Sequence, residues 1–160
     1  MARFQITDCT ARRAPGRLIR RIEKLMTGVM EQRLESAAIN YTQWATLKLI
    51  DEGFAPTAGD LAVQLGHTTG AITRLIDGLE TLDLLRRERG TDDRRVVRLS
   101  VTPAGLAIVD AIKPIVLGAW NEMVEDFDQE EADQLVNSLA KLLSTIERKT
   151  GRTAYAEAAE

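Results

Sequence analysis

Residues Thr68 to Gly105 read "TTGAITRLIDGLETLDLLRRERGTDDRRVVRLSVTPAG", and the change of pattern inside this stretch decides the fold. Its first half places leucine and isoleucine at helical spacing, with Thr68 as the expected N-cap. Two short runs, "LLRRER" and "RVVRLSV", then favour strands around "GTDD", a hairpin loop by its glycine and aspartate content. Thr102 followed by Pro103 predicts the start of another helix, because proline is tolerated at the first helical position.

Three more helices are predicted upstream of this stretch. Residues 16–36 carry a wide apolar stripe, formed by Leu18, Ile19, Ile22, Leu25, Met26, Val29 and Met30. The segment "YTQWATLKLIDEG" predicts a helix that begins with Thr42 as N-cap and stops at Gly53. The segment "TAGDLAVQLG" predicts a short helix with a Thr57–Asp60 capping box that ends at Gly66.

Two helices are expected downstream of the hairpin. The first starts at Pro103 and contains Pro114, which should kink it. Asp128 and Glu131 predict a capping box for the second, which carries a stripe of Leu135, Leu139, Leu142 and Ile146. The predicted order is αααα-ββ-αα, a mainly α fold with a small β-wing.

Composition excludes several classes of protein. The chain has 160 residues, a net charge of −3, one cysteine (Cys9) and one histidine (His67), so neither an internal disulfide nor a Cys/His zinc cage can form. No apolar run reaches the 18 or more residues expected of a membrane span, and the N-terminus lacks the apolar core of a signal peptide. We therefore expect a cytoplasmic protein that is not an enzyme and uses no cofactor.

A short helix, a tight turn at Gly66, a longer helix and an arginine-rich hairpin together have the organisation of a winged helix-turn-helix. The outward face of the longer helix carries small side chains and one arginine, Arg74, which suits a base edge in the major groove. From Leu84 to Arg98 there are six arginines against three acidic residues, a local charge of 6 − 3 = +3. Arginine suits phosphates and narrow minor grooves, so the hairpin is a second candidate DNA contact.

The stretch from Thr68 to Gly105 resembles the core of the MarR (multiple antibiotic resistance regulator) family of bacterial transcription factors. The family pattern is a T-R-L-(V/I)-D-x-L-E helix, an aspartate-x-arginine wing and an L-T-x-x-G helix entry. Here the pattern falls on Thr73–Glu80, Asp93-Arg94-Arg95 and Val101–Gly105. Two positions depart from it, since Asp83 stands where the family usually has glycine and Val101 stands in place of leucine.

The resemblance implies a homodimer that binds a pseudo-palindromic operator, as a repressor, and is released by a small aromatic or anionic effector. It divides the single domain 1–160 into dimerisation helices (16–36 and 102–148) and a DNA-binding lobe (41–101). The expected DNA-binding residues are Thr68, Thr69, Gly70, Thr73, Arg74, Asp77, Arg86, Asp93, Arg94 and Arg95. The expected dimer-interface residues are Leu18, Ile22, Leu135, Leu139, Leu142 and Ile146. An effector pocket is expected at Met26, Met30, Trp44 and Leu47.

Each of these assignments has a plainer alternative. Arg74 could form a surface ion pair with Asp77 or Glu80, and either Arg94 or Arg95 could pair with Asp93. The effector residues could be ordinary core, and Cys9 is expected to be a bystander without a resolving cysteine. A rival function is a helical protein-interaction module whose basic wing contacts an acidic partner protein.

Overall fold

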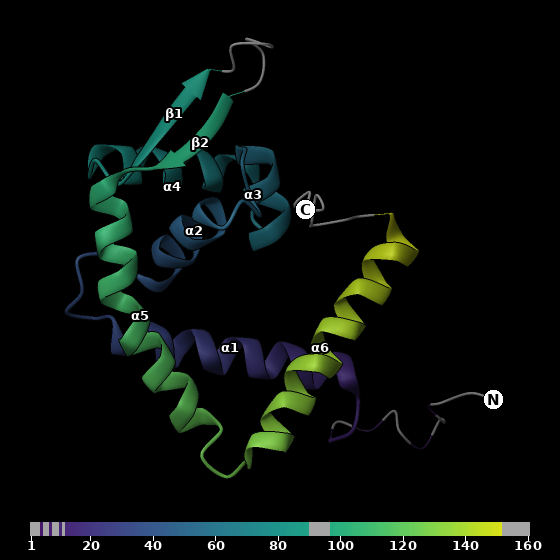
Figure 1. Cartoon of the computed structure of the whole chain (residues 1–160). Coiled ribbons are helices and arrows are strands. Elements are labelled where there is room, and N and C mark those ends of the chain that lie inside the picture. Colours follow the sequence, from purple (N-terminus) through teal and green to yellow (C-terminus); the bar gives the residue numbers. More distant parts are fainter. Residues whose placement is uncertain (1–3, 5–6, 8–9, 11, 90–96, 152–160) are drawn as a thin grey trace.

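The computed structural model of the chain describes residues 4, 7, 10, 12–89 and 97–151 (Figure 1). The observed order confirms the predicted αααα-ββ-αα arrangement. The elements are α1 (Pro15–Arg33), α2 (Tyr41–Asp51), α3 (Ala58–Leu65), α4 (Thr69–Thr81), β1 (Leu85–Arg89), β2 (Val97–Val101), α5 (Pro103–Met123) and α6 (Gln129–Thr150).

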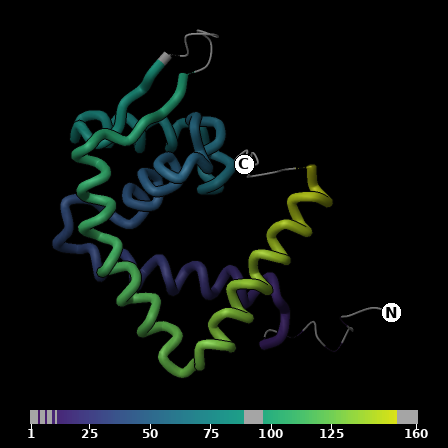
Figure 2. Tube along the Cα trace, in the orientation of Figure 1, coloured from purple at the N-terminus to yellow at the C-terminus, as the bar shows by residue number. Residues whose placement is uncertain are grey.

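The elements form a winged lobe carried on three longer helices. Helices α2, α3 and α4 lie together at one end beside the β1–β2 hairpin, and α5 leads from that hairpin to the far end of the molecule (Figures 1 and 2). Helix α1 packs on α5 and α2. Helix α6 turns back from the end of α5 and stands away from the winged lobe, and none of its residues is buried.

Side-chain caps set where most of the helices begin. Thr57 with Asp60 and Asp128 with Glu131 form the two predicted capping boxes, and Thr68 and Thr102 cap α4 and α5 as expected. The prediction of Thr42 as the cap of α2 is wrong. Asn40 caps that helix, because its side chain accepts a hydrogen bond from the Gln43 amide (2.9 Å) while Gln43 bonds back to the Asn40 amide (3.0 Å).

The core lies inside the winged lobe and along the inner face of α5. It is built from aliphatic side chains of α2, α3, α4, the base of the hairpin and α5, closed by the last turn of α1. Trp44 joins two parts of this core, because its ring packs within it and its indole N–H donates to the carbonyl oxygen of Val109 in α5 (3.2 Å). The winged lobe and α5 therefore share one hydrophobic core.

Helix α5 is, within the described residues, the one helix long and apolar enough by length and composition to cross a membrane. The expectation that no segment could do so rested on unbroken apolar runs, and α5 passes because its charged residues are few. Its inner face, with Val109, Ile112 and Val116, is buried and packs on α2 and α1, as in the core helix of a globular fold. Pro114 lies inside this continuous helix.

A tight junction joins the end of α4, the start of β1 and the start of α5. Asp83 adopts a positive φ of 55°, the left-handed conformation that asparagine and aspartate tolerate better than most residues. The Thr102 hydroxyl donates to the Asp83 carbonyl (2.6 Å), and the Thr102 amide donates to the Leu84 carbonyl (3.1 Å). A Cβ added at Gly105 would lie 2.2 Å from that Leu84 oxygen, so only glycine fits there.

Gly105→Ala is therefore expected to destabilise the protein by about 1–3 kcal/mol, because the backbone of Leu84 must move to admit the methyl group. Gly118→Ala is the matched control in the same helix, since its added Cβ would meet nothing within 4 Å. The control should be neutral or slightly stabilising, as alanine favours helices. Urea denaturation of both variants is the measurement, and equal midpoints would contradict the steric account of the junction.

Candidate nucleic-acid interface

Helix α4 has one buried face and one exposed face. Ile72, Ile76 and Leu79 are fully buried against the lobe. Thr73, Arg74 and Asp77 lie on the other face and are exposed, as predicted for a helix that approaches DNA. The apolar spacing of α4 therefore fixes which of its polar side chains can reach a ligand.

The turn that presents α4 is built by Gly66, His67 and Thr68. Gly66 ends α3 in the left-handed conformation (φ 63°), and the His67 amide donates to the Ala62 carbonyl (3.2 Å). The Thr68 hydroxyl then accepts from the Ala71 amide (3.3 Å). Thr69 and Gly70 in the first turn are exposed, so their amide groups are available to an anion such as a phosphate.

The hairpin forms the predicted wing. Strands β1 and β2 pair antiparallel, from Leu85 opposite Val101 to Arg89 opposite Val97. Leu85 and Leu99 anchor its base in the core, while Glu88 accepts a hydrogen bond from Ser100 on the outer side (2.8 Å). The candidate residues Asp93, Arg94 and Arg95, like Cys9, lie outside the described residues.

The arginines of the wing base have partners inside the protein. Arg87 of β1 forms ion pairs with Asp77 (2.7 Å) and with Glu80, and its amide donates to the other Glu80 oxygen (3.1 Å). Arg86 pairs loosely with Asp83 (3.5 Å). Two residues of the predicted DNA-binding set, Asp77 and Arg86, thus have intramolecular ion-pair partners, and part of the local positive charge is balanced within the lobe.

Arg74 differs from these residues. The sequence left open an ion pair between Arg74 and Asp77 or Glu80, but both carboxylates are paired with Arg87. Arg74 is exposed and has no ion-pair partner among residues 12–89 and 97–151. Sequence reasoning missed Arg87, which it counted only as part of the basic hairpin. Its position in β1, seven residues after Glu80 at the end of α4, was the available signal.

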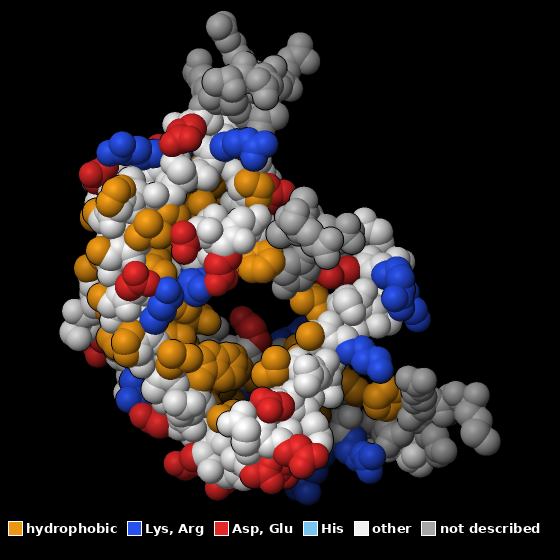
Figure 3. All heavy atoms as spheres, viewed as in Figure 1, with side chains coloured by type: hydrophobic (Ala, Val, Ile, Leu, Met, Phe, Trp, Pro, Cys, Tyr) orange, Lys and Arg blue, Asp and Glu red, His pale blue; other side chains and the backbone are white. Residues whose placement is uncertain are grey.

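The six predicted interface residues are all exposed in the single chain. Their exposed fractions run from 37% for Leu135 to 53% for Ile22, and the set is Leu18, Ile22, Leu135, Leu139, Leu142 and Ile146. Figure 3 shows hydrophobic side chains gathered around the opening between α6 and the rest of the chain. An isolated chain thus leaves a broad apolar surface on α1 and α6 exposed to water.

The four predicted effector residues lie largely in the core. Met30, Trp44 and Leu47 are buried in the hydrophobic core, and Met26 is half-buried. Tyr41 stacks on Trp44 with a centroid distance of 5.8 Å, and burial raises the pKa of its phenol above the usual value. None of the four lines either of the two surface pockets described next.

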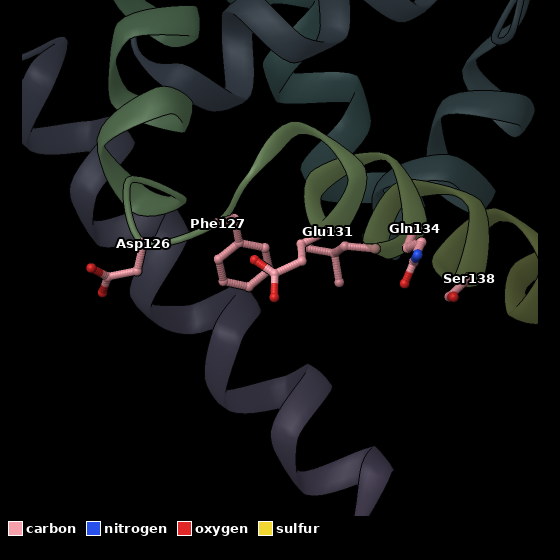
Figure 4. A pocket seen from close by; sticks show the side chains of 6 residues that line it. Asp126, Phe127, Glu131, Gln134 and Ser138 are labelled. Atoms are coloured by element: carbon pink, nitrogen blue, oxygen red, sulfur yellow. The ribbon is translucent and has the colours of Figure 1, made fainter.

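Those two pockets lie at the other end of the molecule. One, of about 480 Å³, lies between α1 and α5 and is lined by Val29, Gln32, Arg33, Ala119, Glu122, Met123 and Glu125. The other, of about 360 Å³, follows the α5–α6 turn, where Figure 4 shows Asp126, Phe127, Glu131, Gln134 and Ser138 along one side. Both are shallow and carry carboxylates, which is unfavourable for an anionic ligand.

Comparison with known proteins agrees with this geometry. The family model described as "MarR family" matches residues 39–97. Wild-type E. coli MarR in its apo form superposes with a TM-score of 0.70 at 25% identity, covering 81% of this chain and 96% of that one. The S. aureus MepR–DNA complex matches with a TM-score of 0.68 at 27% identity, covering 82% and 98%.

A mutant of E. coli MarR complexed with operator DNA matches with a TM-score of 0.69 at 26% identity, covering 80% of this chain and 92% of that chain. The likeness therefore extends beyond the winged lobe to nearly the full length of each relative. The sequence motif, the αααα-ββ-αα fold and these comparisons agree: residues 39–97 match the MarR family model, and the chain is similar in fold to MarR and MepR over most of its length.

Proposed function

We propose that this protein is a cytoplasmic DNA-binding transcriptional regulator that acts as a homodimer on a pseudo-palindromic operator, as a repressor. The observation that carries the proposal is Arg74, exposed without an ion-pair partner among the described residues on the outward face of α4. Two relatives of the same fold, MepR and a MarR mutant, were solved with DNA bound. A two-fold dimer would place its two α4 helices in successive major grooves, about 34–36 Å apart.

Within each half-site, the residues have separate roles in this proposal. The amides of Thr69 and Gly70 hold a phosphate at the N-terminus of α4, while Thr68 and Thr73 approach the backbone and base edges. Arg74 reads a guanine through its O6 and N7 atoms. Arg94 or Arg95 reaches the flanking minor groove or its phosphates, with Asp93 ordering the wing.

The test begins with a selection of genomic fragments by the purified protein. Enrichment of fragments that share an inverted repeat supports the proposal, and enrichment without any shared sequence contradicts it. Expression from a reporter under the selected promoter then decides the sign of regulation. Binding that resists added salt, or that requires an acidic protein instead of DNA, would favour the rival interaction module.

Arg95→Ala is expected to weaken binding to operator and unrelated DNA alike, because a phosphate contact carries no sequence information. The slope of log affinity against log salt should become shallower by about one unit for each lost contact. The measurement is titration of both duplexes at several salt concentrations. An unchanged slope and affinity would show that Arg95 does not contact the DNA.

For regulation we propose a small aromatic or anionic molecule bound where the winged lobe meets α1 and α5. Met30, Trp44 and Leu47 fill this region, so a ligand must rearrange them and can act only by binding one arrangement better than the other. Titration of a Trp120→Phe variant with small aromatic carboxylates should change the emission of Trp44 and lower operator affinity together. No change in either signal for any compound would rule out this mode of regulation.

A further inference from the structure

Arg87 links the wing to the helix proposed to enter the major groove. Its guanidinium donates from one nitrogen to Asp77 (2.7 Å) and from the other to Glu80, and its backbone amide donates to the second Glu80 oxygen (3.1 Å). The Arg87 side chain is 34% exposed, so the pair with Glu80, which is 30% exposed, is partly shielded from water. A planar guanidinium that holds two carboxylates has little freedom to turn.

The neighbouring residue in the same strand provides a contrast. Arg86 has a side chain that is 64% exposed, and its ion pair is with Asp83 at 3.5 Å, outside α4. Two successive arginines of β1 thus differ in their ion-pair partners. Only Arg87 of the two engages carboxylates of α4.

The ion pair between Arg87 and Asp77 affects Arg74, because Asp77 is the carboxylate with which Arg74 could otherwise pair. The two residues are three apart on the exposed face of one helix, the spacing at which an arginine and an aspartate pair. With Asp77 held toward the wing, Arg74 has no ion-pair partner among the described residues. Without Arg87, two uncompensated carboxylates would face the DNA, and one would lie within reach of Arg74.

We propose that Arg87 is a positioning residue for base recognition. It holds Asp77 and Glu80 on the wing side of α4 and so leaves Arg74 free to bind a base, without itself contacting DNA. The inference rests on the proposed function, because it assigns Arg87 a role only if α4 binds DNA. The positioning role explains why this arginine of the basic hairpin forms ion pairs with two acidic side chains of α4.

The experiment compares wild type, Arg87→Ala, the control Arg33→Ala and the triple variant Arg87→Ala/Asp77→Asn/Glu80→Gln. Arg33 is the control because its ion pair is with Glu122 of α5, away from α4. Each is titrated against a selected operator duplex and an unrelated duplex of equal length at several salt concentrations. Arg87→Ala should reduce the preference for the operator by about tenfold for each half-site. Arg33→Ala should keep the wild-type preference, and the triple variant should regain most of it because no carboxylate remains to bind Arg74.

Three results would overturn the inference. These are an unchanged preference in Arg87→Ala, an equal loss on both duplexes with a shallower salt slope, and a triple variant that stays impaired. The second result would mean that Arg87 contacts phosphate directly. If wild type itself shows no preference for any duplex, the proposed function fails, which is a different outcome from a specific wild type with an unaffected variant.

Thermal unfolding and native mass establish that each variant is folded and assembled. Should Arg87→Ala not fold, Arg87→Lys replaces it, because a single ammonium cannot hold two carboxylates with the same fixed geometry. The lysine variant should then show a smaller loss of operator preference than the roughly tenfold expected for alanine. Full wild-type preference in a folded Arg87→Lys protein would show that charge alone suffices and would contradict the positioning role.

Discussion

Leu139→Glu is expected to convert a dimer, with twice the chain mass of 17.7 kDa, into a monomer. Leu139 lies in the apolar stripe of α6 and is 48% exposed in the single chain, although the helix is continuous over 22 residues. In the proposed dimer this stripe is buried against a second copy, which would stabilise a helix that has no buried residue in the single chain. A glutamate there would place an unpaired charge inside the interface, at a cost of several kcal/mol.

The matched control is Asn137→Glu, which adds the same charge to the polar face of α6. It should leave the dimer intact. Light scattering at micromolar concentration measures both masses, and DNA titration should show that the monomeric variant loses most of its operator affinity. A wild-type protein with the mass of one chain would contradict the dimer, and a dimeric Leu139→Glu variant would place the interface elsewhere.

Arg74→Ala is expected to cost about 1–3 kcal/mol of operator binding for each half-site, and so about twice that for the dimer. The reason is the loss of a bidentate contact to one base, which also relaxes the preference at one position in each half-site. Competition titrations with operators that carry every base at each position measure both effects. Arg98→Ala on β2 is the control, since it removes an exposed arginine remote from α4 in sequence.

The sequence dependence of the affinity loss in Arg74→Ala distinguishes a base contact from a non-specific phosphate contact. A variant that binds all duplexes more weakly, with the base preference retained, would show that Arg74 holds a phosphate. If Arg74→Ala keeps the wild-type affinity for every operator, Arg74 does not contact the DNA from the major groove. In either case the assignment of Arg74 as the base-reading residue would be wrong.

Local sequence signals predicted the elements well because each depends on a few neighbouring residues. Thr57 with Asp60 and Asp128 with Glu131 are capping boxes at fixed spacing, and the structure has both. Asp83 takes the positive φ that the departure from glycine suggested. The cap of α2 was misassigned because threonine and asparagine both cap helices, and only the position of Gln43 distinguishes them.

Side-chain contacts between elements distant in the sequence could not be predicted in the same way. Arg87 could have faced solvent, DNA or α4, and the choice depends on how β1 lies beside α4. The same limit applies to Met30, Trp44 and Leu47. Apolar side chains at helical spacing indicate burial but not whether a pocket opens beside them.

The exposed apolar stripe of α6 indicates a contact outside the single chain. Periodicity identifies Leu135, Leu139, Leu142 and Ile146 as one face, and the structure leaves that face uncovered within the single chain. A helix that is amphipathic but unburied indicates a partner, and in the proposed dimer this partner is a second copy of the chain.

One measurement tests the central claim most directly: titration of a selected operator with the wild-type protein at several salt concentrations, with the stoichiometry read from the saturated complex. The account predicts two chains bound per inverted repeat. It also predicts a linear fall of log affinity with log salt and a clear preference over unrelated DNA of equal length. Equal affinity for operator and unrelated DNA at every salt concentration would contradict sequence-specific recognition by this protein.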